Sequence, residues 1–320
     1  MAKNDTLIED LMRILCLGAG AIGGYFGGRL VEAGADVTFL VREGRKKALT
    51  ENGLRIESSF GDLVSPVNVV TMEEITGDYD VVLLTCKAYD LPSAMQTIAP
   101  AVGSGTAILP LLNGLAHIDL LNEKFGRTRV LGGVAKIAAT LTPDGVIKHL
   151  NDWRYITFGE QDGAMSPRVL ALKAAFDKTS VVATAVPNIM QVMWEKIVHL
   201  ATIAGMTCTM RASVGEIART QHGASLMVEF LGRNAAIARE EGFAPSDKFM
   251  AEYKILFSDV QSKYTASMLR DIERCNAIEA DHIIGFMLDK ANKHNIDPTL
   301  HRFAYTHLQS YEQRRAANRC

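Results

Sequence analysis

The chain has 320 residues, a formal net charge of -2, 48% hydrophobic residues and 22% charged residues. This length exceeds what one hydrophobic core usually supports, so we expect two domains. The charge gives no reason to expect nucleic acid or an acidic membrane as a partner, and no apolar run approaches the roughly 18 residues that cross a bilayer.

The cysteines and the amino-terminal segment indicate the compartment. Five cysteines stand at positions 16, 86, 208, 275 and 320 with no CxxC pair, which is typical of reduced thiols in a cytosolic protein. The segment Met1–Leu11 lacks the apolar core of a signal peptide and reads as a short extension. We therefore expect a soluble, cytoplasmic protein.

The first predicted elements carry a dinucleotide fingerprint. An apolar strand, Arg13–Leu17, leads through a GxGxxG motif into a helix over Ala21–Ala33 that Gly34 ends. The first glycine permits a sharp turn, the second lets a pyrophosphate approach the backbone, and the third allows close packing of the helix on the sheet. The free N–H groups at the start of the helix then hold the phosphates. The sequence predicts a dinucleotide cofactor, and hence a redox enzyme, with these cofactor-binding residues: Gly18, Ala19, Gly20, Ala21, Ile22 and Gly23.

The later elements predict the architecture. Further strands at Asp36–Val41, Asp80–Cys86 and Thr106–Leu112 are almost wholly apolar at their centres, as in a parallel sheet covered on both faces. An antiparallel stretch follows, with turns at 143–145 and near Gly163. From Pro187 onward the pattern is helical. We predict a Rossmann-type, mostly parallel sheet domain over residues 1–185 and an all-helical carboxyl-terminal domain over 186–320, with the boundary at 184–187.

The end of the second strand indicates which dinucleotide binds. NAD enzymes place an Asp or Glu there to bind the ribose 2′-hydroxyl. This strand ends in Arg42, with Arg45 one turn on, and Glu43 is the nearest acid. A guanidinium suits a 2′-phosphate because it offers bidentate charged donors. We therefore favour NADP(H), with Arg42 on its 2′-phosphate; the alternative is that both arginines are solvated surface charges.

Two polar residues follow the next strands at the edge where ligands of such sheets bind. Lys87 comes after Asp80–Cys86, and Asn113 comes after Thr106–Leu112, with Gly114 making a turn. Lys87 could instead be a lysine leaving the core, and Asn113-Gly114 an ordinary turn. Their shared edge favours a role for both in lining the ligand cleft.

Two charged residues fall on apolar helix faces of the second half. Lys196 lies in the stripe formed by Ile189, Val192, Met193, Ile197 and Leu200. Glu279 lies in the inner stripe of a helix predicted from Met268 to Leu288, together with Cys275. Burial lowers a lysine pKa toward a range useful for proton transfer, so the pair suggests a general acid and its orienting carboxylate. A structural salt bridge is the alternative.

Ser267 opens the second of these helices, where it would favour an anion or act as an N-cap. The eight histidines show no HxH or HExxH spacing, so we expect no metal site. His149, His199 and His282 are interpreted as packed or surface histidines.

Together these residues resemble the ketopantoate reductase (2-dehydropantoate 2-reductase) family from Arg13 to about Tyr311. The matching segments are ILCLGAGAIGGYFGGRL, the Arg42 strand end, LLTCKAYD, LLNG, NIMQVMWEK and TASMLRDIERCNAIEADHIIGF. The resemblance implies NADPH-dependent reduction of a 2-keto acid in pantothenate and coenzyme A synthesis. It makes Lys196 the proton donor, puts Asn113 and Ser267 on the substrate, and places Lys87 near cofactor and substrate. It also places Glu279 beside the cofactor and the lysine, and gives Ala139 a backbone contact with the cofactor.

One departure from the family bears on the substrate. The family usually has asparagines one and two turns after the lysine, where this chain has Leu200 and Ala204. Missing hydrogen bonds of this kind can change substrate discrimination by orders of magnitude. His199, Thr202 and Thr207 are candidates to replace them. Ketopantoate is the predicted substrate, and the alternatives are a paralogous reductase of another 2-keto acid or a non-enzymatic NADP-binding regulator. A homodimer is left open.

Overall fold

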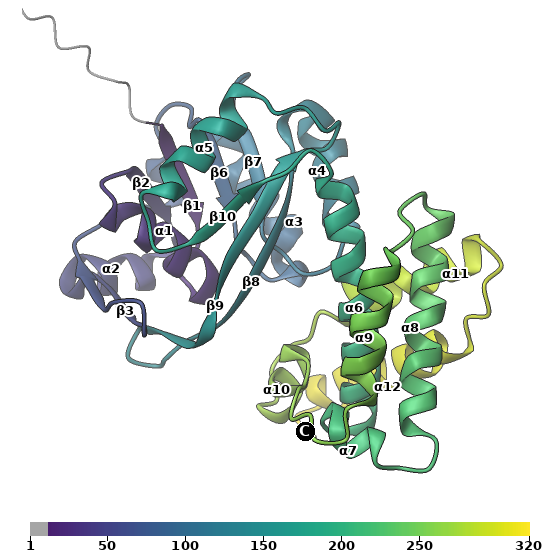
Figure 1. The fold of residues 1–320 in the computed structure, drawn as a ribbon. Helices are drawn as coiled ribbons and strands as arrows, with labels where there is room; N and C mark the ends of the chain where they lie inside the picture. Colours follow the sequence, from purple (N-terminus) through teal and green to yellow (C-terminus); the bar gives the residue numbers. More distant parts are fainter. Residues whose placement is uncertain (1–11) are drawn as a thin grey trace, which may run out of the picture. The chain divides into compact units, whose positions relative to one another are not determined.

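The computed structural model describes residues 12–320, which form two compact units (Figure 1). One unit runs up to residue 86 and also includes residues 92–111 and 124–187. The other consists of residues 87–91, 112–123 and 188–320. The predicted extension Met1–Leu11 lies outside the described residues. The helical unit thus includes two short segments from the first half of the chain, whereas the predicted division placed a single boundary at 184–187.

A five-stranded parallel sheet, in the order β5-β2-β1-β6-β7, is the centre of the first unit. The chain crosses from the β2 side of β1 to β6 on its other side, so the sheet has a topological switch point at the end of β1. The four predicted parallel strands are confirmed, with ends shortened by up to two residues: β1 (Arg13–Leu17), β2 (Asp36–Leu40), β6 (Val81–Leu84) and β7 (Ala107–Pro110). The edge strand β5 (Asn68–Val70) was not predicted.

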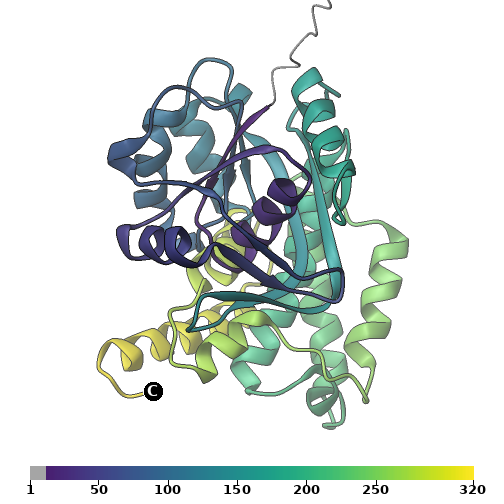
Figure 2. The ribbon, with the colours of Figure 1, turned by 90° about the vertical axis from the view of Figure 1, so that its left-hand side faces the viewer.

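The second sheet is built on a long antiparallel hairpin of β8 (Leu131–Leu141) and β9 (Val146–Glu160), teal in Figures 1 and 2. Its turn is closed by a hydrogen bond from the Gly145 N–H to the Thr142 carbonyl (2.9 Å), with Gly145 at φ 83°. The predicted antiparallel stretch is therefore confirmed. The sheet also contains β3 (Leu54–Glu57) and β10 (Val182–Ala185), which both run parallel to β9, and β4 (Leu63–Ser65), which pairs antiparallel with β3. The sequence did not indicate the two parallel pairings.

Helix α1 (Ala21–Glu32) packs against strands of both sheets and ends near Gly34, as predicted. It buries Tyr25 and Phe26 fully, and Phe26 packs edge-on against Phe176. This aromatic contact joins α1 to the second sheet, because Phe176 also packs against Phe158 of β9. The other helices between strands are α2 (Glu43–Asn52), α3 (Leu91–Ile98), α4 (Ala116–Phe125) and α5 (Pro167–Asp177).

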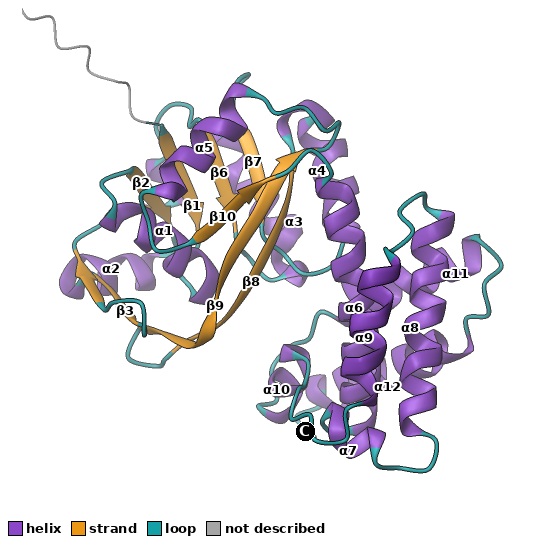
Figure 3. Cartoon of the chain, viewed as in Figure 1, coloured by secondary structure: helices purple, strands orange, loops and turns teal. Residues whose placement is uncertain are grey.

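Residues 188–320 contain helices and turns but no strand (Figure 3). The longest helix, α6, packs against α8, α10 and α12. None of the helices over residues 12–320 is both long and apolar enough to cross a membrane. The helices are α6 (Ile189–Met210), α7 (Val214–Ala218), α8 (Gly223–Glu240), α9 (Asp247–Ser258), α10 (Ser267–Glu273), α11 (Phe286–Lys293) and α12 (Thr299–Ala316).

The single helix predicted from Met268 to Leu288 is wrong. Helix α10 ends at Glu273, Cys275 takes a left-handed conformation at φ 56°, and the Asn276 N–H closes the turn on the Asp271 carbonyl (2.9 Å). A π-helical segment, η5 (Asp281–Gly285), then leads into α11. Cys275 is consequently exposed and not on an inner stripe, and Glu279 lies in the connection between helices.

Candidate active site

The glycine-rich loop of the first unit fits a bound pyrophosphate. Gly18 turns the chain at φ 91°, and Gly20 is the N-cap of α1 without a side-chain cap or an acidic residue in the first turn. A Cβ on Gly20 would meet no atom within 4 Å, whereas one on Gly23 would lie 2.3 Å from the Gly18 carbonyl oxygen and the Thr85 hydroxyl oxygen. The loop therefore leaves space above Gly20, offers free N–H groups, and needs glycine at position 23 for packing.

Side chains from neighbouring elements hold this loop in place. The Thr85 hydroxyl donates to the Leu17 carbonyl (2.7 Å), and the Arg45 guanidinium donates to the Ala19 carbonyl (2.9 Å). Burial, with a contribution from Arg55, lowers the pKa of Arg45. Arg45 is thus a structural part of the loop, and neither it nor Thr85 was assigned this role from sequence.

Arg42 is exposed and forms the N-cap of α2, two residues after the end of β2. A residue that binds the 2′-substituent of the cofactor's ribose is expected after the second strand, and Arg42 lies there. Ala139 lies half-buried at a bulge in β8, in the same unit as the loop. The predicted cofactor residues Gly18–Gly23, Arg42 and Ala139 are all in the first unit, and the remaining predicted site residues are in the second.

Glu279 is the centre of a polar cluster in the helical unit. Only 5% of it is exposed, and its carboxylate accepts hydrogen bonds from the Ala88 N–H (3.1 Å) and the Asn113 side-chain amide (3.3 Å). The Lys87 ammonium lies 3.6 Å from the same carboxylate. A buried carboxylate is tolerated when donors surround it in this way. The structure therefore brings together Lys87, Asn113 and Glu279 from three separate segments.

Asp271 is a member of this cluster that the sequence did not reveal. Its carboxylate lies 3.1 Å from the Lys87 ammonium. Burial opposes the charge on Lys87, but Glu279 and Asp271 outweigh it and raise the pKa of that lysine. Asp271 is one turn after Ser267 on α10. This spacing from a predicted site residue was the only feature of the sequence that could have indicated Asp271.

Lys196 projects from α6 in an environment that disfavours its charge. Burial lowers the pKa of Lys196 to about 8, and the negative charge of Glu279 opposes this shift. A lysine with a pKa near neutrality can both hold and release a proton at physiological pH, which a general acid requires. Lys196 and Glu279 therefore interact electrostatically, and their roles as acid and orienting carboxylate stay a prediction.

His117 is a second buried group near Lys196 that the sequence did not single out. It lies on α4, four residues after Asn113, with 1% of its surface exposed. Neither ring nitrogen has a hydrogen-bond partner among residues 12–320. Burial, together with the charges of Lys196 and His282, lowers the pKa of His117 to about 3. The ring is consequently neutral and adds no positive charge beside Lys196.

Ser267 is exposed and is the first residue of α10, while Ala266 occupies the N-cap. The N-cap alternative for Ser267 is therefore wrong, because the cap precedes it and makes no side-chain hydrogen bond. Lys87 pairs with Asp271 on the same helix, so α10 contributes to the cluster.

The positions one and two turns after Lys196 carry apolar residues that are partly or fully buried. Leu200 is half-buried and Ala204 is fully buried. The buried hydroxyls of Thr202 and Thr207 donate to the Val198 and Ile203 carbonyls (2.7 Å each). Both hydroxyl protons are therefore used in hydrogen bonds within α6. His199 stacks on Tyr264, whose hydroxyl lies 3.2 Å from its ring.

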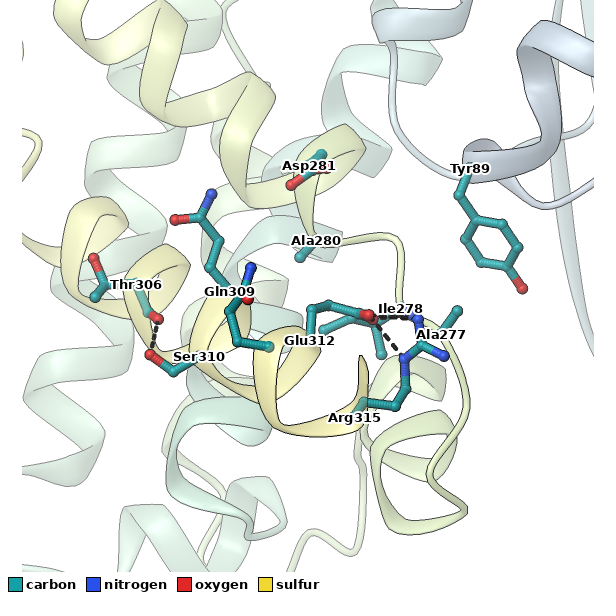
Figure 4. A pocket seen from close by; sticks show the side chains of 11 residues that line it. Tyr89, Ala277, Ile278, Ala280, Asp281, Thr306, Gln309, Ser310, Glu312 and Arg315 are labelled. Carbon is teal, nitrogen blue, oxygen red and sulfur yellow. Dashed lines mark hydrogen bonds and ion pairs between the residues drawn. The ribbon is translucent and has the colours of Figure 1, made fainter. Parts of the chain in front are cut away.

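A cavity of about 650 Å³ lies against the segment around Glu279 (Figure 4). It is lined by Tyr89, by the neighbours of Glu279 on both sides and by polar residues of α12. Those neighbours are Ala277, Ile278, Ala280 and Asp281. None of Lys87, Asn113, Lys196 and Glu279 lines it, so it is distinct from the polar cluster.

A Rossmann-type unit followed by a helical unit with a desolvated lysine defines the class of protein, an oxidoreductase. Residues 14–163 match the family model described as ketopantoate reductase PanE/ApbA, and residues 188–312 match the model of its carboxyl-terminal part. The uncharacterized oxidoreductase YkpB of Bacillus subtilis is 33% identical, covering 94% of this chain and 99% of its own length. The chain belongs to the ketopantoate reductase family.

More distant relatives agree with this assignment. The 2-dehydropantoate 2-reductase of Mesorhizobium japonicum is 27% identical over 85% of this chain and 89% of its own. The solved 2-dehydropantoate 2-reductase of Geobacter metallireducens is 28% identical with a TM-score of 0.84, covering 93% of this chain and 99% of its own. D-mandelate dehydrogenase, solved with NADH and anilino(oxo)acetate, shares the fold at 20% identity, with a TM-score of 0.82 and coverage of 95% and 100%.

Proposed function

We propose that this protein catalyses the NADPH-dependent reduction of 2-dehydropantoate (ketopantoate) to pantoate, a step of pantothenate and coenzyme A synthesis. The observation that carries the proposal is the environment of Lys196, whose pKa burial lowers to about 8 beside the carboxylate of Glu279. Family membership supplies the reaction type.

The cofactor would be held by the first unit, with its pyrophosphate on Gly18–Gly23, its 2′-phosphate on Arg42 and a backbone contact from Ala139. When bound, the nicotinamide supplies a hydride. Lys87, Asn113 and Glu279 would contribute contacts from the helical unit. The preference for NADPH rests on Arg42, since two mandelate dehydrogenase neighbours are described with NADH.

Lys196 would act as the general acid. As the carbonyl carbon of the 2-keto acid is reduced, negative charge develops on its oxygen, and the Lys196 ammonium stabilises this charge and donates a proton. Glu279 keeps the ammonium protonated against desolvation, as its effect on the Lys196 pKa supports. Asn113 and Ser267 would bind the substrate, with Ser267 on its carboxylate.

A second candidate is the reduction of a different 2-keto acid. The apolar Leu200 and Ala204, where the family usually has asparagines, favour it. A non-enzymatic NADP-binding regulator is disfavoured because such a protein needs neither Lys196 nor Glu279. A homodimer also remains part of the proposal, and the neighbour from Staphylococcus aureus is described as dimeric.

The test is the rate of NADPH consumption by the purified protein with ketopantoate, other branched 2-keto acids and mandelate-type keto acids, each repeated with NADH. We expect a kcat/KM for ketopantoate of about 10⁴ M⁻¹s⁻¹ or more. Slow turnover of ketopantoate beside fast turnover of another acid would establish the second candidate. Tight binding of NADPH without turnover of any acid would contradict both.

A further inference from the structure

Arg45 of α2 connects the glycine loop to a turn that comes 100 residues later in the chain. Its guanidinium donates to the Ala19 carbonyl (2.9 Å), and both of its Nη atoms donate to the Gly145 carbonyl (3.4 Å each). Ala19 is the second residue of the fingerprint, and Gly145 directly precedes β9. All three residues belong to the first unit. One side chain thus binds a carbonyl of the loop and a carbonyl of the β8–β9 turn.

The β8–β9 turn is held by bonds of its own. The Gly145 N–H donates to the Thr142 carbonyl (2.9 Å), and the Thr142 hydroxyl donates to the Val146 carbonyl (3.0 Å). Arg55 of β3, the strand that pairs with β9, donates to the Asp144 carbonyl and lies 3.7 Å from the Asp144 carboxylate (Figure 1). The turn therefore presents the Gly145 carbonyl as a fixed acceptor.

The position of Arg45 is also determined on its own helix. The Arg45 N–H donates to the Arg42 carbonyl (2.9 Å) in the first turn of α2. A Cβ on Gly145 would lie 2.8 Å from one Arg45 Nη atom, and Gly145 is left-handed at φ 83°. Glycine at position 145 therefore permits both the turn and the close approach of the guanidinium.

A carbonyl that is held in this way orients the N–H group next to it. In a trans peptide the C=O of one residue and the N–H of the next point in opposite directions. The bond from Arg45 to the Ala19 carbonyl therefore points the Gly20 N–H away from Arg45. N–H groups that face one side together bind an anion, and α1 adds the N–H groups of its first turn. The Ala19 carbonyl oxygen, which would repel a phosphate, is kept on the opposite side.

The two preceding carbonyls are held by uncharged donors. The Thr85 hydroxyl donates to the Leu17 carbonyl (2.7 Å), and the Cys16 thiol donates to the Gly18 carbonyl (3.5 Å). Of these three donors only Arg45 is charged, and a charged hydrogen bond is roughly twice as strong as a neutral one. Arg45 therefore contributes most to the orientation of this part of the loop.

We propose that Arg45 is a positioning residue for the pyrophosphate of the dinucleotide, which holds the Ala19 carbonyl in place and takes its own position from the β8–β9 turn. This inference rests on the proposed function, because it concerns the same cofactor. Arg45 acts through the backbone of the loop, whereas Arg42 is proposed to bind the 2′-phosphate. Because NADPH and NADH have the same pyrophosphate, Arg45 contributes equally to the binding of both.

The test is a fluorescence titration of Arg45→Met with NADPH and with NADH. Methionine keeps the apolar stem of the side chain and removes the guanidinium. We expect both dissociation constants to rise roughly tenfold or more, and by the same factor. Arg45→Lys returns one charged donor and should recover part of the loss for both cofactors. Lys47→Met removes an exposed charge from the same helix and should change neither dissociation constant.

A second variant tests the contribution of the turn. Gly145→Ala places a methyl group 2.8 Å from the Arg45 guanidinium, so it should displace that group and weaken both dinucleotides by the same factor. Gly242→Ala is the control, because Gly242 is also left-handed (φ 89°) but its Cβ would meet nothing within 4 Å. It introduces the same backbone strain and should leave both affinities unchanged. Urea unfolding without cofactor shows that each variant is folded.

The outcomes separate this inference from the proposed function. A loss of NADPH affinity alone in Arg45→Met would show that Arg45 binds the 2′-phosphate directly, and this would overturn the inference. Unchanged affinities in Arg45→Met or in Gly145→Ala would overturn it as well. If Arg45→Met does not fold, Arg45→Lys and Gly145→Ala decide by the same comparison. Failure of the unaltered protein to bind either dinucleotide would instead contradict the proposed function, and the inference with it.

Discussion

The proposed chemistry of the helical unit depends on one lysine whose charge is costly to desolvate. Removing an ammonium group from water disfavours its charged form, and this desolvation lowers the pKa of Lys196 to about 8. Glu279 limits the shift without cancelling it. Lys87, close to the same carboxylate and half-exposed, has a raised pKa. Two lysines near one carboxylate therefore differ in acidity because Lys87 has a second acidic partner, Asp271, and is less buried.

The first prediction concerns the pH dependence of turnover. A general acid works only while protonated, so kcat should be level below pH 8 and fall as the pH rises through about 8. Lys196→Arg keeps a cation whose pKa is far higher, so the alkaline decline should disappear from the profile of whatever activity remains. Lys196→Met should lower kcat by roughly 10²- to 10⁴-fold. The measurement is steady-state kinetics from about pH 6 to about pH 10.

The control for this experiment is Lys248→Met, which removes an exposed lysine of α9 that lies 4.0 Å from Glu252. It should leave both kcat and the pH profile unchanged. Lys196→Met with near-native kcat would show that another group donates the proton.

Arg42 determines the second prediction, which concerns cofactor choice. A charged hydrogen bond to a phosphate contributes about 1.5–3 kcal/mol, so Arg42→Ala should weaken NADPH roughly 10- to 100-fold. NADH lacks the 2′-phosphate and should lose little affinity. Fluorescence titration with both cofactors measures the two losses. Lys47→Ala is the matched control, because it removes an exposed charge from the same helix; equal losses of NADPH and NADH in Arg42→Ala would refute the role of Arg42.

At the scale of elements, two glycines of one loop serve different purposes. In Gly20→Ala the new methyl group meets no protein atom, so the free energy of unfolding should stay within about 1 kcal/mol. The methyl group would occupy the space that a pyrophosphate needs, so cofactor affinity should fall by roughly tenfold or more. Gly23→Ala places a methyl group 2.3 Å from the Gly18 carbonyl oxygen and should destabilise the fold by about 1–3 kcal/mol or more.

The two glycine variants are compared by urea unfolding without cofactor and by cofactor titration. Gly44→Ala, in α2, is the control, since its Cβ also meets nothing within 4 Å. The assignment of the loop fails if Gly20→Ala binds cofactor as tightly as the unaltered protein.

Elements with strong local patterns were predictable, and elements determined by distant contacts were not. Four of the five parallel strands and α1 were predicted to within two residues because continuous apolar runs and glycines mark them, whereas the three-residue strand β5 was missed. The prediction of one helix over Met268–Leu288 is wrong because Cys275 adopts a left-handed conformation. Glycine or proline usually marks such a helix end in a sequence, and neither stands near Cys275. The turn is instead stabilised by Tyr311 and Glu312, some 35 residues later in the chain.

The same limit applies to the polar cluster. Strand ends suggested Lys87 and Asn113, and helical periodicity suggested Lys196 and Glu279. His117 had no local signal, and Asp271 had only its spacing from Ser267, because the roles of both depend on segments 87–91 and 112–123 packing within the helical unit. Periodicity indicates which side of a helix is buried but not which side chain it will meet.

At the scale of the whole molecule, stability against acid depends on carboxylates whose pKa is lower in the folded protein than in the unfolded chain. Glu241 follows α8 and contacts three basic side chains of α11 and the residue after it: Lys290 (2.9 Å), Lys293 (2.8 Å) and His294 (2.6 Å). Burial raises its pKa, but the hydrogen bonds from Lys293, His294 and Lys290 outweigh burial and lower the pKa of Glu241 to about 2.

This shift predicts how stability changes with pH. The folded-state pKa lies below the ordinary value of 4.5, so the folded protein holds fewer protons than the unfolded chain between those two values. The stabilisation, at most about 3 kcal/mol, is therefore complete above pH 4.5 and is lost as the pH falls toward 2. Glu241→Gln should lower the free energy of unfolding at neutral pH, and the difference from the unaltered protein should narrow below about pH 4.5.

Urea unfolding at several pH values between about 3.5 and 7 measures that difference. Glu252→Gln is the control, since Glu252 lies 4.0 Å from Lys248 and both side chains are largely exposed, so it should have a negligible effect at every pH. A constant difference between Glu241→Gln and the unaltered protein across this range would mean that packing or hydrogen bonding of Glu241, and not its charge, joins α8 to α11. A difference that narrows with acid would show that one carboxylate secures the end of two helices through its charge.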